Sequence, residues 1–181
     1  MKLNKLAMVL GFGVALTAGA ASAANQGSGT VKFSGSIIDA PCSIKNTNID
    51  VDLGAVSSHI LKDGGSSTPK AFKIELKNCT AQTQNGVKTT FDGAQATEKG
   101  LLGIEGPASG AAIAITNAGG TIIPLGTESG KFSLHEGSND LNFAAHLKGI
   151  TTEQGADGKN QHSVIKPGEF TAIANFTLNY L

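Results

Sequence analysis

The chain ends in the stretch EFTAIANFTLNYL, residues 169–181, in which apolar and polar side chains alternate from one residue to the next. A period of two puts successive side chains on opposite faces of a β-strand and predicts one buried face. Because chain ends fray unless they are tied into the fold, a strand patterned to its last residue is expected to be held by the domain. The pattern alone also suits the last core strand of a self-contained sandwich. The face expected to be buried carries Phe170, Ala172, Ala174, Phe176, Leu178 and Tyr180.

The preceding sequence has the same character, with short alternating runs separated by residues that favour turns. Strands are expected over residues 29–38, 48–56, 71–79, 87–91, 112–116, 121–125, 141–148 and 169–181. Residues 151–162 are polar and contain glycine, so they are interpreted as a loop. Helical periodicity is missing. The pattern predicts an all-β sandwich formed by one domain.

The first residues have the layout of a secretory signal peptide. Lys2 and Lys5 precede the uncharged apolar run 6–20, and residues 21–23 fit the small-residue cleavage pattern. A membrane anchor is the weaker interpretation, since a spanning helix needs about 20 apolar residues and this run is rich in Gly and Ala. We therefore expect residues 1–23 to be removed on export.

Two cysteines, Cys42 and Cys79, lie in the exported part of the chain. An even number beyond a signal peptide predicts one disulfide, because exported proteins fold in an oxidising compartment. Two buried free thiols are the alternative. A bridge that closes a loop of this size would stabilise the fold by about 4 kcal/mol.

The composition argues against nucleic-acid binding and against catalysis. The chain has no arginine and its lysines are scattered, whereas nucleic-acid binding needs a basic patch. The four histidines, at positions 59, 135, 146 and 162, lack metal-ligand spacing and are expected on the surface. No G-x-S-x-G motif occurs. We expect no catalytic residue, no metal ion and no cofactor.

A second alternating segment lies between the cleavage site and Cys42. Its start, residues 24–28, is small and polar and therefore flexible without a partner. An arm that pairs outside its own domain would have this pattern, and so would an ordinary first strand. The residues in phase are Gly27, Gly29, Val31, Phe33 and Gly35.

Three features together resemble the major pilins of chaperone–usher fimbriae, in particular the P-type and type 1 subunit families. The block GTVKFSGSIIDAPCSI, residues 29–44, is similar to the opening of those subunits. The strand IELKNC, residues 74–79, ends where such pilins place their second disulfide cysteine. At the C-terminus, Tyr180 is the penultimate residue and Gly168 is fourteenth from the end, as in that family's terminal motif. The resemblance covers the whole mature chain.

The resemblance implies an incomplete immunoglobulin-like sandwich, with six strands of its own plus a donated strand. Residues 24–35 would form an N-terminal donor-strand extension that donates through its in-phase residues 27–35, and residues 36–181 would form the domain. A groove between the first and sixth strands would accept the donated strand and meet the chaperone. The residues implied for that groove are Gly168, Phe170, Ala172, Ala174, Phe176, Leu178, Tyr180 and Leu181.

The resemblance also implies the partners and the destination. A periplasmic chaperone would lend a strand first, an outer-membrane usher would follow, and identical or related pilin subunits would polymerise head-to-tail. The product would be a fimbria that supports adhesion, exported through the periplasm to the bacterial surface. A minor adaptor or terminator pilin, or a receptor-binding subunit of the same fimbria, is the alternative. A self-sufficient periplasmic domain is a third possibility.

Overall fold

The computed structural model describes residues 29–35, 37, 40–80, 85–154 and 160–181. The chain divides into two units, Met1–Ile37 and Ile38–Leu181. In the first unit the described residues form no helix or strand, and Val31 and Phe33 are 74% and 89% exposed. The strand predicted over residues 29–38 is therefore not formed in the described part of this segment. A strand needs a neighbour to complete its hydrogen bonds, and none of the described residues supplies one.

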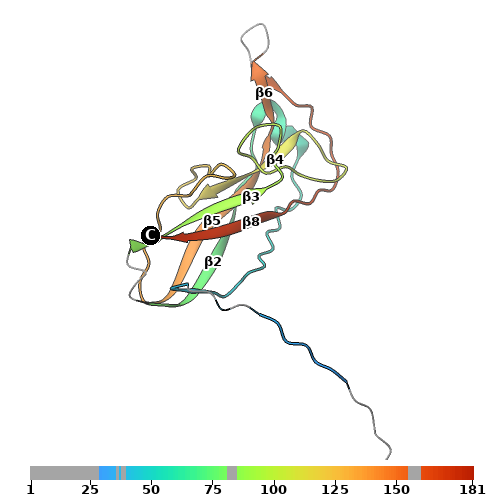
Figure 1. Cartoon of the computed structure of the whole chain (residues 1–181). Helices are drawn as coiled ribbons and strands as arrows, with labels where there is room; N and C mark the ends of the chain where they lie inside the picture. The colour runs from blue at the N-terminus through green and yellow to red at the C-terminus, as the bar shows by residue number, and fades with distance from the viewer. Residues whose placement is uncertain (1–28, 36, 38–39, 81–84, 155–159) are drawn as a thin grey trace, which may run out of the picture. The chain divides into compact units, whose positions relative to one another are not determined.

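The second unit contains a four-stranded antiparallel sheet, which Figure 1 shows with β2 and β5 at its centre. The strands, in spatial order, are β1 (Ser43–Ile44), β2 (Lys70–Cys79), β5 (Gly137–Gly149) and β4 (Ala111–Asn117). Along β2 and β5 the inward side chains alternate with exposed ones, as the sequence pattern requires. The strands predicted over residues 71–79, 112–116 and 141–148 are confirmed.

A second layer is formed by β3 (Val87–Gly93) and β8 (Ala174–Tyr180), which pair antiparallel along their whole length. Residues 126–132 bond to the other edge of β3, for example through the Phe132 N–H and the Val87 carbonyl at 2.8 Å. The end of the chain is held, because the Leu181 N–H donates to the Gly86 carbonyl at 3.1 Å. The prediction of a terminal strand tied into the domain is confirmed for residues 174–180.

The two layers are joined along one side by residues 102–109. Leu102 pairs with Ile113 of β4, and Glu105 then pairs with Thr171 ahead of β8. At one end of the domain the 3-10 helix η1 (Ser58–Gly64) packs against the end of β5 and against a small hairpin. The hairpin consists of β6 (Thr151–Gln154) and β7 (Asn160–His162), and Figure 1 shows it extending from the end of the sheet.

The core lies between the two layers. Ile74 and Leu76 of β2 and Leu141 and Phe143 of β5 are between 0% and 1% exposed. Phe143 packs against three other rings, with centroid distances of 5.0 to 5.7 Å, which suits the quadrupoles of aromatic side chains. These are the rings of Phe72, Phe91 and Phe132. The domain is therefore an all-β sandwich of the immunoglobulin-like kind.

The predicted disulfide between Cys42 and Cys79 is confirmed. Both cysteines are 5% exposed, and the bridge lies where the chain enters β1 and leaves β2. Beside it the Thr80 N–H donates to the Pro41 carbonyl at 3.0 Å. The bridge therefore fixes the start of the domain to the end of its second strand.

Two further predicted strands and one predicted loop are wrong. Residues 48–56 form no strand, although Ile49 and Leu53 do pack against the core. Residues 121–125 make only an isolated bridge to β4, because Pro124 has no N–H to continue the ladder and the Leu125 N–H donates to the Gly100 carbonyl at 3.0 Å. Residues 151–162, expected to be a loop, contain the β6–β7 hairpin. No helix among the described residues is long and apolar enough to cross a membrane.

Candidate functional site

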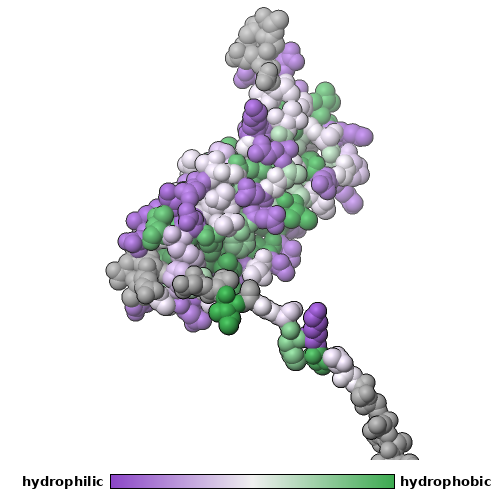
Figure 2. Space-filling model, in the orientation of Figure 1, coloured by the Kyte–Doolittle hydropathy of each residue, from purple (hydrophilic) through white to green (hydrophobic). Residues whose placement is uncertain are grey.

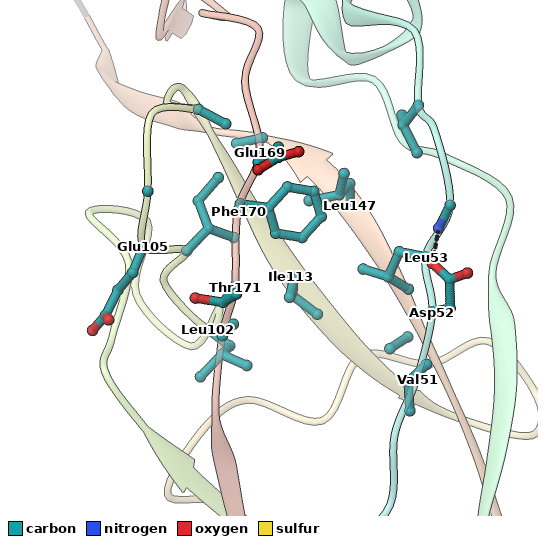
Figure 3. A pocket seen from close by; sticks show the side chains of 18 of the residues that line it. Val51, Asp52, Leu53, Leu102, Glu105, Ile113, Leu147, Glu169, Phe170 and Thr171 are labelled. Carbon is teal, nitrogen blue, oxygen red and sulfur yellow. Dashed lines mark hydrogen bonds between the residues drawn. The ribbon is translucent and has the colours of Figure 1, made fainter.

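A groove of about 1170 Å³ runs between two extended segments of the domain (Figure 3). Residues 47–58 form one wall, called the first wall below. Residues 165–176, which lead into β8, form the second wall. In Figure 3 the Leu53 side chain comes from the first wall, the Phe170 ring from the second, and Ile113 and Leu147 lie between them.

The floor of the groove is the apolar core itself. Except for the half-buried Phe72, the floor side chains are only 3% to 8% exposed, yet they line an open channel and not a closed interior. Figure 2 shows hydrophobic residues, in green, along this face of the domain. A contiguous apolar channel of this size marks a site of association and not an ordinary surface. The floor residues are Leu61, Phe72, Phe91, Leu102, Ala111, Ile113, Ile115, Ala145 and Leu147.

The side chains of the two walls are only half-buried. Ile49, Leu53 and Val56 of the first wall pack against the core but stay partly open to solvent. Val51 lines the groove and is also half-buried. The inward residues of β8 are also half-buried along the whole strand. An inward residue of the other sheet, Leu141 of β5, is by contrast only 1% exposed. The core is therefore covered from within but lacks a layer between the walls.

The edge of β8 that faces away from β3 carries unpaired backbone groups. Antiparallel ladders use alternate residues on the two edges of a strand. The odd-numbered residues of β3 bond to residues 126–132, so its even-numbered residues bond to the odd-numbered residues of β8. The N–H and C=O groups of the even-numbered residues 174–180 then point to the opposite edge. Within the described ranges no strand pairs with that edge.

The second wall continues this open edge ahead of β8. The Thr171 N–H and carbonyl both bond to Glu105, at 2.8 Å each, on the same side as β3. Figure 3 shows Glu105 on one side of the segment 169–171 and the first wall on the other. The backbone groups of Phe170 and Ala172 are therefore directed toward the groove.

The first wall begins where Asn46 ends the pairing with β2. The Asn46 side chain accepts from the Glu75 N–H at 2.7 Å and donates to the Lys73 carbonyl at 3.1 Å, so it replaces the next backbone bonds of the ladder. Beyond it, no backbone–backbone hydrogen bond joins residues 47–56 to another described segment. Inside this stretch the Gly54 N–H donates to the Asp52 side chain at 2.8 Å, and Gly54 has a φ of +68°. Both walls thus present free backbone groups to the groove.

The residues expected for the groove lie on it or continue from it. Gly168, Phe170, Ala172, Ala174 and Phe176 line the groove. Leu178 and Tyr180 continue the same face of β8 past the lining, and Leu181 follows with 44% of its surface exposed. The Tyr180 hydroxyl is buried without a hydrogen-bond partner among the described residues, and burial raises the pKa of this phenol.

Gly168 has a steric reason to be glycine. A Cβ at this position would lie 2.7 Å from the Ala108 N atom and 2.9 Å from the Pro107 carbonyl carbon. The second wall could then not approach the segment that joins the two layers. The sequence pattern identified Gly168 only by resemblance, and the structure supplies this contact.

The residues expected for the donor arm belong to the first unit. Gly27 lies outside the described residues, and Gly29, Val31, Phe33 and Gly35 lie in the exposed stretch 29–35. Sequence reasoning missed the first wall as part of a site and also the segment 104–109, which lines the same groove. The alternation of residues 49, 51 and 53 was the available signal, but it equally fits a core strand.

The groove offers no arrangement for catalysis or metal binding among the residues described. Its charged side chains, such as Asp52, Glu105 and Glu169, are separate and lie on the exposed rim. No group of three or more His, Cys, Asp or Glu residues in the described ranges could hold a metal ion. His146 is half-buried on the outer face of β5, and this burial lowers the pKa of its imidazole. The shape and the apolar floor of the groove suit an extended apolar segment.

Comparison with known proteins gives consistent results. The family model described as fimbrial protein matches residues 31–181. The major MR/P fimbria protein of Proteus mirabilis (strain HI4320) is 55% identical over 184 residues, which cover 99% of each chain. Fimbria A protein of Serratia marcescens is 49% identical over 185 residues, again 99% of each chain.

The solved structures agree with these relatives. A crystal structure of the P pilus rod subunit PapA matches 78% of this chain and 100% of its own, with 30% identity and a TM-score of 0.64. A chain in the structure of a chaperone–usher pilus, determined in a study of rod uncoiling, matches 86% of this chain and 97% of its own. It has 32% identity and a TM-score of 0.66.

Proposed function

Because this chain belongs to the fimbrial protein family and is a structural major pilin of the chaperone–usher type, we propose that its groove accepts the N-terminal arm, residues 24–35, of another copy. The observation that carries this proposal is the pair of walls whose facing backbone groups have no partner in the described chain. One inserted strand would complete both walls and cover the apolar floor.

The exposed residues of the arm have the properties that such a strand needs. Val31 and Phe33 are in phase, and both are largely exposed in the free chain. Burying each of them in the groove would contribute about 2 kcal/mol. Each backbone hydrogen bond to a wall would add about 1 kcal/mol net, independent of sequence. The side chains would then set the register, while the backbone would supply much of the attraction.

The glycines of the arm suit a strand that lies close to other backbone. Gly29 and Gly35 are in phase with Val31 and Phe33, so all four would face the floor. We expect these two positions to lie over shallow parts of the groove, where a Cβ would clash. Alternating small and large residues would therefore admit one register and disfavour its neighbours.

Polymerisation follows from the separation of donor and acceptor. The arm and the groove are different parts of one chain, so each copy can fill the groove of one neighbour and offer its own groove to another. Contacts of this head-to-tail kind produce an open filament unless the rotation closes a ring. We assign the chain to the shaft of a surface fimbria on this basis.

Delivery to the filament requires protection of the open groove. An exposed strand edge over an apolar floor would aggregate if it stayed uncovered. We propose that residues 1–23 direct export and that a periplasmic chaperone lends a strand until an outer-membrane usher exchanges it for the arm. The Leu181 carboxylate, next to the open edge of β8, would bind basic side chains of the chaperone. The role is structural and needs no catalytic group.

Deletion of residues 24–35 tests the proposal. In cells that export the other fimbrial components, the shortened subunit should accumulate with its chaperone and form no fibre, since it accepts an arm but offers none. As matched substitutions in the full chain, Phe33→Asp should block assembly, whereas Lys32→Asp, on the opposite face of the arm, should allow it. Fibres of normal length from the deleted subunit would contradict the proposal.

A further inference from the structure

A smaller hollow of about 260 Å³ lies at the end of the domain, beyond the start of the second wall. It is lined by Lys62 and Asp63 of η1 and by residues 162–165. Ile165 also lines the main groove, as does Leu61 beside Lys62. The hollow therefore continues the groove past the point where the second wall begins.

An exposed branched side chain lines this hollow, and another lies nearby on η1. Val164 is 88% exposed, and Ile60 of η1 is 46% exposed. Asp63 is one of two non-glycine residues in the described chain with positive φ, at 57°. A residue held in this uncommon conformation costs free energy and tends to occur where a site needs a particular shape. The apolar and conformational features at this end point to a contact with another molecule.

The length of the arm, residues 24–35, indicates which molecule contacts the hollow. Residues 24–35 and the second wall, residues 165–176, contain equal numbers of residues and each span about 40 Å at about 3.3 Å per residue. All strand pairs of the described domain are antiparallel. An arm that follows this rule would place its last residue near Ile165. The next residue in phase with Val31 and Phe33 would then reach the hollow.

That residue is Ile37, which is fully exposed in the described chain. Building on the proposed function, we propose that the hollow is a second contact between successive subunits, in which Ile37 of the incoming copy packs against Val164. The occupant is thus a second copy of this chain. The contact lies outside the groove and would hold the root of the arm against the preceding subunit. The contact would restrict the angle between successive subunits of the filament. A donated strand followed by a free linker would not restrict that angle.

The test compares junctions between subunits in fibres of the full chain. The variants are Ile37→Ser, Val164→Ser and the double variant, with Ile173→Ser as the matched control because Ile173 is 79% exposed on the outer face leading into β8. Fibres of each are incubated in graded guanidinium, and the rate at which junctions dissociate is measured. We expect each of the first two variants to dissociate about tenfold faster and the control to behave like the wild type.

The double variant decides the assignment. If Ile37 and Val164 contact each other, removing both should be no worse than removing one, so the double variant should also be about tenfold faster. A hundredfold acceleration, or single variants that dissociate like the control, would overturn the inference. Failure of the proposed function has a different signature, because assembly would then survive Phe33→Asp whatever happens at Val164.

Discussion

Replacing Cys42 and Cys79 together by alanine should destabilise the domain by about 4 kcal/mol. The bridge joins residues separated by 37 positions, and closing a loop of this length lowers the entropy of the unfolded chain and raises its free energy by roughly that amount. Both residues are 5% exposed, so alanine introduces no buried polar group. The bridge also holds the chain just before the first wall, which has no backbone ladder of its own in the described structure.

The measurement is urea unfolding of the exported full chain in the presence of a saturating synthetic peptide of residues 24–35. The peptide would fill the grooves and prevent polymerisation, so that wild type and variant are compared as filled monomers. With a slope of about 2 kcal/mol per molar urea for a domain of this size, the midpoint should fall by about 2 M.

Two controls separate the bridge from the cysteine side chains. Cys42→Ala alone also breaks the bridge and should cost nearly as much as the double replacement. Reducing the wild-type protein should lower its midpoint by a similar amount. If the double variant lost less than about 1 kcal/mol while the slope stayed the same, the argument from loop closure would be refuted.

Three further predictions concern the packing and charge of the domain. Gly168→Ala should cost about 2 kcal/mol in urea unfolding because of its short contacts to Pro107 and Ala108, whereas Gly130→Ala, with nothing within 4 Å, should be neutral. Ile74→Ala, at a site with no exposed surface, should cost about 2–5 kcal/mol, but Ile173→Ala should cost less than about 0.5 kcal/mol. Hydrogen bonds from Lys45 and then Lys73 lower the pKa of Glu75 to about 2, so its stabilising effect should be complete above about pH 5. That effect should disappear as the pH falls to about 2, and acid titration should show no such loss in Glu75→Gln.

The alternation of side chains predicted the strands that have the core on one face and solvent on the other. β2 and β5 are of this kind, with Ile74 and Phe143 inside and Lys73 and Asn142 outside. The β6–β7 hairpin escaped prediction because its residues are polar, which hides a period of two. Residues 121–125 were wrongly predicted for the opposite reason, since a strand-like composition could not reveal that the Leu125 N–H bonds to Gly100 and not to β4.

The groove could be predicted only in part. The inward face of the terminal strand was visible as residues 170–180, and the resemblance implied a partner for it. The first wall and the contact of Gly168 with Pro107 involve segments far apart in sequence. Alternation with a period of two shows which face of the strand a residue occupies. It does not show which edge of the strand has a hydrogen-bonding neighbour.

Two of the failed strand predictions have a common physical explanation under the proposed function. Residues 48–56 and the described part of residues 29–38 both alternate as strands do, yet neither forms a ladder within the described chain. Alternation reports that one face will be buried, whereas a ladder requires a neighbouring backbone. If the arm of one copy lies between the walls of another, each of these segments gains in the filament the neighbour that it lacks alone. The prediction from sequence would then be correct for the polymer and wrong for the isolated chain, and the mismatch itself marks where one copy joins the next.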